Sequence, residues 1–244
     1  MYFNKPLIDT NIPDIKYLAP IPVYQHQFED HEFHDRLFQM GFTHLDELQR
    51  RMGQELPGQF DKDRYDGYSD WYGNQDAWVE DGFPPIGSRF SVPPNDFLEI
   101  DNVDVKEMRQ RIIEAFTHTI KAIGAVPSDA ELDPKITESW AQWYEPHDGR
   151  GHNKHNHCRW DPNEAPFIGF SGGYYLSDGE PFADHTYSGA FCFHVRDYDY
   201  YIRPKKGMLV LWPYDIVHSV TPFYGKSHRC VVNFNIQVDK PWWQ

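Results

Sequence analysis

Three histidines are the residues of this sequence whose spacing most clearly suggests chemistry. His155 and His157 are separated by one residue, and His218 follows much later in the run Trp-Pro-Tyr-Asp-Ile-Val-His. Residues two apart on a β-strand project from the same face, so both imidazoles of the pair can reach one ion. Two imidazoles from one strand and a third from a distant one are typical of a first-row transition-metal site with open coordination positions.

Arg229 is the next residue that the pattern marks out. It is followed by the largely apolar run Cys230–Phe234, where burial of a guanidinium without an anion would be costly. A planar guanidinium is the natural bidentate partner of a carboxylate. In a regular strand Asn233 and Asn235 face the same side as Arg229, so we expect the two amides to line the same pocket.

The second half of the sequence is predicted to form the β-core that positions these side chains. From Ile136 onward, short runs rich in Tyr, Phe, Trp, Val and Ile alternate with Gly, Pro and Asp, which is typical of antiparallel strands and turns. The expected strands are Ile136–Tyr144, Phe167–Leu176, Gly189–His194, Tyr200–Arg203, Met208–Trp212 and Cys230–Val238. We therefore expect an antiparallel sandwich or a small barrel.

Asp104–Ile123 is the clearest helix in the first half. Its apolar residues recur at helical spacing, which predicts one buried face against a sheet. Asp104 and Glu107 resemble a capping box, and Gly124 suits the left-handed residue that often follows a helix.

The rest of the first half has weaker signals. Glu29–Leu56 has a helical period, and we expect Gly41 to divide it into two short helices. Leu18–Phe28 is expected to be an edge strand because prolines lie near its start. Residues 58–102 are rich in aromatic side chains without a clear period; they are expected to be a loop packed over the core, or else a lid or substrate wall.

Composition and charge limit the classes of protein. The net charge of −14 argues against a nucleic-acid partner, which requires a positive surface. Three cysteines without paired spacing indicate no disulfide framework, and no apolar run suggests a signal peptide or a membrane span. We expect a cytoplasmic protein that does not bind membranes. The whole chain, 1–244, is predicted to be one domain, in which residues 1–135 support a β-core at 136–238.

Several segments, taken in chain order, resemble the iron(II)- and 2-oxoglutarate-dependent dioxygenases, especially the prolyl-hydroxylase-like branch. They are Trp143-Tyr144-Glu145-Pro146, His155-Asn156-His157, Ser171-Gly172-Gly173-Tyr174-Tyr175-Leu176, Pro204-Lys205-Lys206-Gly207-Met208-Leu209-Val210-Leu211-Trp212-Pro213, and His218 with Arg229 eleven positions beyond it. Each motif is weak by itself, and the ordered set is the specific feature. The resemblance covers about residues 136–238 and, more weakly, Leu18–Phe28.

The resemblance implies an α+β chain, mainly β, whose core is a double-stranded β-helix (jelly roll) braced by N-terminal helices. It implies a hydroxylase that uses Fe(II), 2-oxoglutarate and O₂ and releases succinate and CO₂. The ligand set that it suggests for the iron is His155, His157 and His218. Arg229 would bind the distal carboxylate of 2-oxoglutarate with a tyrosine hydroxyl beside it, and the position favours Tyr175 over Tyr144.

Position 157 departs from the family pattern, because the usual ligand there is acidic and this sequence has histidine. Three interpretations remain open. His157 itself binds the metal, or a nearby acid such as Asp161 completes the site, or the register differs and His152 takes part. Three neutral imidazoles leave more positive charge on the metal than a set with one carboxylate, and this charge still suits an anionic chelator.

Two other classes of function compete with this interpretation. The spacing of residues around the histidines is also close to both cupin motifs, with Asp161 and Asp215 where cupins prefer Glu and Gly. A cupin-type metalloenzyme would share the fold but use no 2-oxoglutarate and have no evident role for Arg229. A non-catalytic β-sandwich binding module would have structural histidines and use the aromatic segment 58–102 as its platform.

The sequence does not name the primary substrate, and the expected partner is a small molecule or a peptide. Trp242 and Trp243, which follow Pro241 near the end of the chain, offer a homodimer interface as one interpretation. The other interpretation is a tail that folds back on the core.

Overall fold

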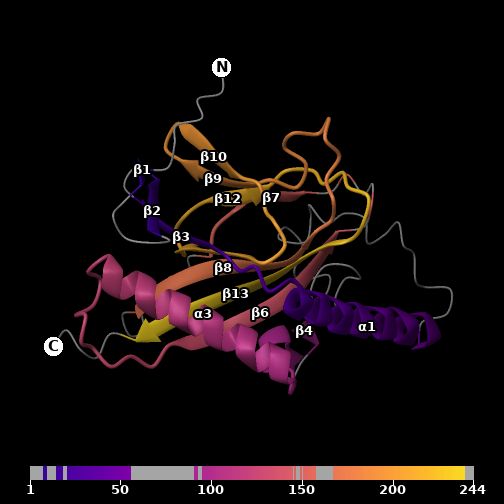
Figure 1. Cartoon of the computed structure of the whole chain (residues 1–244), viewed down its shortest axis with the longest axis horizontal. Coiled ribbons are helices and arrows are strands. Elements are labelled where there is room, and N and C mark those ends of the chain that lie inside the picture. Colours follow the sequence, from indigo (N-terminus) through magenta and orange to yellow (C-terminus); the bar gives the residue numbers. More distant parts are fainter. Residues whose placement is uncertain are drawn as a thin grey trace.

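The computed structural model describes the side chains of residues 21–43, 97–144, 146, 149, 151–157 and 167–239. It also describes the backbone of residues 8–9, 15–18, 44–55, 91–92 and 95–96. In that part of the chain, no helix combines the length and the apolar character needed to cross a membrane. Two antiparallel sheets stack into a sandwich, and helices α1 and α3 lie against the outer face of the larger sheet (Figure 1).

Eight strands of the second half form the core of the sandwich. They are β6 (Lys135–Tyr144), β7 (His152–His155), β8 (Phe167–Asp178), β9 (Phe191–Val195), β10 (Tyr198–Ile202), β11 (Met208–Pro213), β12 (His218–Val220) and β13 (Arg229–Asp239). One sheet contains β11, β8, β13 and β6 side by side, and the other contains β10, β9, β12 and β7. Successive strands alternate between the two sheets except at β9 and β10, which is the jelly-roll connectivity. The predicted double-stranded β-helix is therefore confirmed.

The N-terminal strands extend the larger sheet beyond β11. They are β1 (Ile8–Asp9), β2 (Ile15–Leu18) and β3 (Ile21–Gln27), and the sheet order is β1-β2-β3-β11-β8-β13-β6. The expectation of an edge strand at Leu18–Phe28 is wrong, because β3 pairs with β2 on one side and with β11 on the other. The pairing with β11 runs only from Tyr24 to Gln27, so the missing N–H of Pro22 interrupts no bond to β11.

Helix α1 (His31–Glu55) is continuous, so the predicted division at Gly41 is wrong. A Cβ atom at position 41 would lie 3.1 Å from the Trp143 ring and 3.3 Å from the Phe97 ring. Gly41 therefore allows close packing of the helix against the core, and the cost of a glycine within a helix is only about 1 kcal/mol.

Three short elements lie between α1 and α3 in the part of the chain that the structure describes. They are β4 (Ser91–Val92), β5 (Asn95–Asp96) and the 3-10 turn Phe97–Glu99.

Helix α3 (Val103–Ala122) matches the predicted helix but begins with a different cap. The side chain of Asn102 accepts hydrogen bonds from the backbone N–H groups of Asp104 and Val105, at 2.8 and 3.3 Å. Asn102, not Asp104, is thus the N-cap residue. At the other end Gly124 has a φ of +71°, as predicted, and its N–H donates to the carbonyl of Lys121.

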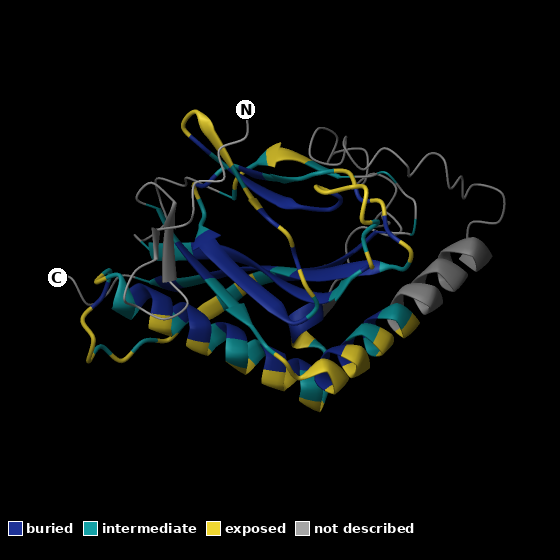
Figure 2. Cartoon of the chain, turned by 45° about the horizontal axis from the view of Figure 1, so that its top comes forward, coloured by how far each residue is buried: buried dark blue, intermediate teal, exposed yellow. Residues whose placement is uncertain are grey.

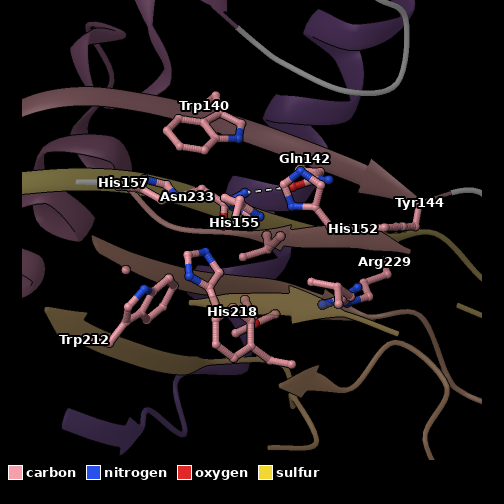
Figure 3. Close-up of a pocket in the computed structure, with 15 residues that line it drawn as sticks. Trp140, Gln142, Tyr144, His152, His155, His157, Trp212, His218, Arg229 and Asn233 are labelled. Atoms are coloured by element: carbon pink, nitrogen blue, oxygen red, sulfur yellow. Dashed lines mark hydrogen bonds between the residues drawn. The ribbon is translucent and has the colours of Figure 1, made fainter. Parts of the chain in front are cut away.

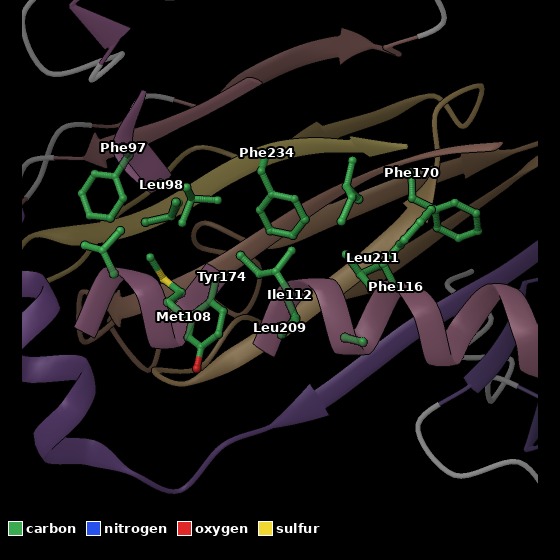
Figure 4. Close-up of a cluster of buried hydrophobic side chains, with 14 of the residues drawn as sticks. Phe97, Leu98, Met108, Ile112, Phe116, Phe170, Tyr174, Leu209, Leu211 and Phe234 are labelled. Atoms are coloured by element: carbon green, nitrogen blue, oxygen red, sulfur yellow. The ribbon is translucent and has the colours of Figure 1, made fainter. Parts of the chain in front are cut away.

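Two apolar cores hold the sandwich and its helices together. The first lies between the larger sheet and the helices, where Met108, Ile112 and Phe116 of α3 pack on Tyr174 and Phe234 of the sheet (Figure 4). The second lies between the two sheets. Figure 2 shows the inner strands as buried and the solvent face of α3 as exposed. Each fully buried Phe, Ile or Met contributes roughly 1.5 to 3 kcal/mol, so these cores fix the sheet positions on which the site depends.

His34 on α1 gives the fold a predicted pH dependence. It is fully buried, its Nε2 lies 3.0 Å from the hydroxyl of Tyr174, and burial beside Arg111 lowers its pKa to about 4. Lys206 and His31 lower this pKa further and Asp30 opposes them. The folded state disfavours the protonated imidazole. The contribution of neutral His34 to the free energy of unfolding is therefore fully present above about pH 6.5 and is lost as the pH falls toward 4.

Between pH 7 and pH 4.5, we expect the free energy of unfolding of the wild type to fall by about 2 kcal/mol more than that of His34→Gln, which has no imidazole to protonate. Urea unfolding of both proteins across this range measures the difference. Parallel pH profiles for the two proteins would contradict it.

Candidate metal centre

One pocket of the described residues lies between the two sheets and collects most of the predicted site (Figure 3). Strands of both sheets contribute to its lining. The residues lining it are Trp140, Gln142, Tyr144, His152, His155, His157, Gly172, Tyr175, Phe191, Trp212, His218, Val220, Arg229, Val231 and Asn233. In Figure 3 His155, His157 and His218 lie together in one part of the pocket, and Arg229 lies to the other side, with His152 and Tyr144 nearer to it.

The structure brings His155, His157 and His218 together. His155 on β7 stands directly opposite His218 on β12, and their ring centres are 4.2 Å apart. The ring of His157 lies 5.2 Å from His155 and 5.1 Å from His218. One nitrogen of each imidazole lies within 4.8 Å of the corresponding nitrogens of the other two. Two segments that are distant in sequence, the end of β7 and the start of β12, thus present one set of nitrogen donors.

In each of the three rings, Nδ1 is the nitrogen that lies next to a hydrogen-bonding oxygen. Nδ1 of His155 lies 2.7 Å from the carbonyl oxygen of Asn153, and Nδ1 of His218 lies 2.9 Å from that of Ile216. A carbonyl oxygen only accepts, so both Nδ1 atoms must carry the proton. Nδ1 of His157 lies 2.7 Å from Oδ1 of Asn235. With Nδ1 protonated, Nε2 of each neutral ring carries the lone pair that binds a metal.

Burial favours the neutral form of these imidazoles. The pKa of His155 is lowered by burial, against the opposing effect of the Asn153 carbonyl. The pKa of His218 is lowered well below its usual value by burial and then by His155 and His157. Neutral imidazole is the form that ligates metal ions, so the lowered pKa values keep His155 and His218 in their binding form at neutral pH.

His157 lies just beyond the end of β7, which stops at His155. Its orientation therefore does not come from strand alternation, as the sequence suggested, but from two other contacts. Its backbone N–H donates to the carbonyl of Tyr214 at 2.9 Å, and its ring is held by Asn235. The ring also lies nearly parallel to Trp140, with centres 6.0 Å apart.

Asn235 links His157 to a carboxylate. Nδ2 of Asn235 donates to Oε2 of Glu138 at 3.0 Å, and the hydroxyl of Ser171 donates to Oδ1 of Asn235 at 2.9 Å. The carboxylate only accepts, so it fixes which way the amide points and leaves Oδ1 to face His157. Asn235, predicted to line the pocket, lies behind His157 instead. The sequence gives no sign that Glu138 and Ser171 support His157, because only their pairing opposite Asn235 across the sheet places them here.

We expect Asn235→Ala to weaken binding of a divalent metal about 10- to 30-fold, because outer partners of a ligating histidine orient its ring and fix its tautomer. Titration with Mn(II) measures this, with Asn233→Ala as the matched control on the same strand. Asn233 donates to Gln142 at 3.0 Å and bonds no histidine of the described residues, so its loss should leave metal affinity within about threefold of wild type. Equal effects of the two substitutions would contradict the role of Asn235.

Arg229 is a buried cation at the far end of the pocket. Its side chain is 1% exposed, and Nε, Nη1 and Nη2 make no hydrogen bond of standard geometry to the described residues, although the Tyr175 hydroxyl is near enough for Arg229 to act on its pKa. The guanidinium carbon lies 4.5 Å from the ring centre of Tyr144 and 5.5 Å from that of Tyr175. Contacts with aromatic faces do not replace the hydrogen bonds that a buried guanidinium loses from water. This arrangement fits a site that binds an anion.

The two predicted tyrosines line the same end of the pocket as Arg229. Tyr144 faces Arg229 across the β6–β13 pairing. Burial raises the pKa of Tyr175, and Arg229 offsets part of this rise. Tyr175 is therefore protonated at neutral pH and can donate a hydrogen bond to an anion held by Arg229. Asn233 also lines the pocket, as predicted.

The alternatives for the metal ligands have different outcomes. His152 lines the pocket, and its ring centre lies 4.3 Å from that of His155, but it is not one of the three residues whose nitrogens converge. Asp161 lies outside the described residues, as do Cys158 and Trp160. Within the described residues, no carboxylate joins the three histidines. The donor set fits a first-row divalent metal, for which imidazole nitrogen is a common ligand.

Two further expectations, for the aromatic segment 58–102 and for the C-terminal tryptophans, concern residues that lie largely outside the described part of the chain. Most of the aromatic segment 58–102 lies outside it, although Phe97 and Leu98 belong to the buried core. The C-terminal residues Trp242 and Trp243 lie outside it as well.

No protein-family profile matches the sequence, and no curated protein matches it. Solved structures do match the fold. A Pseudomonas putida prolyl-4-hydroxylase is 13% identical, covers 91% of this chain and 95% of its own, and gives a TM-score of 0.45. A Trichoplax adhaerens prolyl hydroxylase, solved with a hypoxia inducible factor peptide fragment, is 13% identical, with coverage of 72% and 78% and a TM-score of 0.42.

A 2OG-Fe(II) oxygenase family oxidoreductase from Burkholderia pseudomallei is 14% identical, with coverage of 61% of this chain and 60% of its own, and a TM-score of 0.39. Similarity at this level does not assign individual residues, so the site rests on the geometry described above. The chain thus has structural matches, across most of its length, to prolyl 4-hydroxylases and 2OG-Fe(II) oxygenases.

Proposed function

We propose that this protein is an Fe(II)- and 2-oxoglutarate-dependent oxygenase that hydroxylates a C–H bond of a small-molecule or peptide substrate. The observation that carries the proposal is one pocket with two kinds of binding group. Three imidazoles converge in one part of it, and a buried guanidinium without a hydrogen-bond partner among the described residues lies at the other end. A ligand that chelates a metal and ends in a distal carboxylate satisfies both groups at once.

The histidines hold and orient the metal in this proposal. His155, His157 and His218 each offer Nε2, and the acceptors on their Nδ1 atoms keep the rings in place. When bound, iron(II) together with 2-oxoglutarate and O₂ supplies the oxidising power for hydroxylation, with release of succinate and CO₂. Three protein ligands leave open coordination positions for a chelating co-substrate and O₂.

Arg229 and Tyr175 orient the co-substrate. The guanidinium offers paired N–H donors to the distal carboxylate, and the Tyr175 hydroxyl offers a further one. Because both groups are buried, they exclude water from this carboxylate, and the electrostatic attraction is stronger than at the surface. This anchoring would direct the oxoacid end of 2-oxoglutarate toward the histidines.

Aromatic and apolar side chains form the walls between the two ends. Phe191 and Trp212 pack against His218, with ring centres 5.3 and 4.8 Å from it. Val231 on β13 lines the pocket as well. Such walls keep the reacting atoms away from bulk water. The polar pair of Gln142 and Asn233 on the neighbouring wall offers hydrogen-bonding groups for orientation.

A cupin-type metalloenzyme is the second candidate, and one observation favours it. The converging set contains three histidines and, within the described residues, no acid, whereas the resemblance calls for an acid at position 157. That candidate gives Arg229 no role. A guanidinium buried at the end of the pocket favours the oxoacid-binding proposal.

Turnover of 2-oxoglutarate tests the proposal. Purified protein given Fe(II), 2-oxoglutarate, ascorbate and O₂ should form succinate slowly even without the primary substrate, and His218→Ala should not. A protein that binds both Fe(II) and 2-oxoglutarate but forms no succinate, even when candidate substrates are supplied, would overturn the oxygenase assignment.

A further inference from the structure

A second group of metal-binding side chains lies outside the pocket, on the outer face of the smaller sheet. Cys192 and His194 on β9 alternate with Phe191 and Phe193, which face the core between the sheets. Asp199 on β10 stands opposite His194. One ligand atom of each of Cys192, His194 and Asp199 lies within 4.8 Å of the other two. Strands β9 and β10 are on the side of the sandwich away from α1 and α3 (Figure 1).

The ring of His194 is oriented by contacts on both of its nitrogens. Nδ1 lies 2.5 Å from Oδ1 of Asp199 and 3.9 Å from Sγ of Cys192. Nε2 lies 2.8 Å from the hydroxyl of Ser219, which belongs to β12 and stands opposite Cys192. One nitrogen thus faces the other two ligand atoms while the second is held by an oxygen, as is usual for a histidine that binds a metal.

We propose that Cys192, His194 and Asp199 form a second metal site, for a cation of the zinc class, with Ser219 orienting the histidine and solvent in the fourth position. Cysteine, histidine and aspartate are all zinc ligands. Bond lengths of about 2.0 Å to nitrogen and oxygen and 2.3 Å to sulfur place tetrahedral ligand atoms roughly 3.3 to 3.6 Å apart. The Cys192–His194 distance is close to this, and Asp199, whose side chain is 46% exposed, can rotate outward to meet it.

A nucleophilic role for these residues is less well supported. Cys192 is 1% exposed, and burial raises the pKa of its thiol to about 11, whereas reactive cysteines are accessible and have a lowered pKa. Ser219, His194 and Asp199 have the hydrogen-bond order of a hydrolase triad. However, β9 and β12 are each paired with strands on both sides, which engages the backbone N–H groups that an oxyanion would need. A metal ion would be bound by both the thiol of Cys192 and the carboxylate of Asp199, whereas a Ser219–His194–Asp199 triad gives Cys192 no role.

Cobalt(II) titration of the reduced protein tests this site, because a thiolate bound to cobalt gives a near-ultraviolet charge-transfer band that three histidines cannot give. We expect the band in wild type, its removal by Zn(II), and its loss in Cys192→Ser. His155→Ala and Cys158→Ser should both retain it; the latter is needed because Cys158 adjoins His157 in the sequence.

Asp199→Asn is the second variant, and its exposed position makes misfolding a minor concern. Removal of a ligand should weaken the cobalt affinity measured from this band at least about 10-fold. Absence of the band in wild type, its persistence in Cys192→Ser, its loss in Cys158→Ser, or an unchanged affinity in Asp199→Asn would each overturn the proposal. None of these results depends on the activity proposed for the pocket.

Discussion

Arg229→Met is expected to raise the Kd for 2-oxoglutarate by roughly 150-fold, or about 3 kcal/mol, while metal affinity stays near that of the wild type. Methionine removes the charge and the donors but keeps an unbranched side chain of similar length. The metal ligands lie in another part of the pocket, so their hydrogen bonds to Asn153, Asn235 and Ile216 remain. Titration of the Mn(II)-loaded protein with 2-oxoglutarate measures the change.

The same substitution has a second expected effect, on the ligand-free protein. Arg229 is buried with no hydrogen-bond partner for its guanidinium nitrogens among the described residues, so its replacement should raise the free energy of unfolding by about 1 to 3 kcal/mol. Thermal or urea unfolding without ligands measures this.

Arg111→Met is the matched control for Arg229→Met. Arg111 also lies over aromatic rings, 4.2 Å from the ring centre of Phe33, but it is on α3 outside the pocket and is bonded to Glu107. It should leave the Kd for 2-oxoglutarate unchanged. Equal loss of metal and 2-oxoglutarate binding in Arg229→Met would contradict the separate roles assigned to the two ends of the pocket.

His218→Ala is expected to weaken divalent-metal binding more than about 100-fold, beyond the range seen when only an outer partner is lost. His218 is 3% exposed and is the one ligand of the three contributed by β12, so no neighbour on that strand can replace it. Equilibrium dialysis of each protein against a series of Mn(II) concentrations measures the loss of metal affinity. Binding of 2-oxoglutarate should weaken with it, because chelation needs the metal.

His152→Ala is the control that separates the two histidine sets left open by the sequence. His152 lies in the same pocket beside His155, but its nitrogens are not among those that converge. We expect its loss to change metal affinity less than about fivefold. If His152→Ala is as damaging as His218→Ala while His157→Ala is mild, the ligand set is wrong and His152 replaces His157.

Much of the fold was predictable because its signals are local. The apolar stripe of α3 and the uninterrupted apolar run of β11 (Met208–Pro213) depend only on neighbouring residues. The errors came where tertiary contacts override local preference. Gly41 suggests a break, but it packs against Trp143 within a continuous helix. The three-residue strand β12 is too short to give a pattern, and its place is fixed by pairing with β7 and β9.

The candidate site was predictable to the extent that it depends on residue type and order. The three histidines converge, and Arg229, Tyr175 and Asn233 line their pocket. What could not be predicted is the network behind them. Glu138 reaches His157 only through Asn235 and across the sheet, and no sequence spacing encodes that register. The cluster on the outer face around His194 was not predicted either. Cys192, His194 and Asp199 are near in sequence, but they meet only because β9 pairs with β10, and Ser219 joins them from β12.

The measurement that tests the central claim most directly is an anaerobic titration of metal-free protein with Fe(II) and then with 2-oxoglutarate, followed in the visible spectrum. The proposal predicts a charge-transfer band that requires both additions and is absent in His218→Ala. Tight metal binding with no such band, and with no competition between 2-oxoglutarate and other metal-binding anions, would contradict it. That result would favour a cupin-type site and leave Arg229 to bind a different anion.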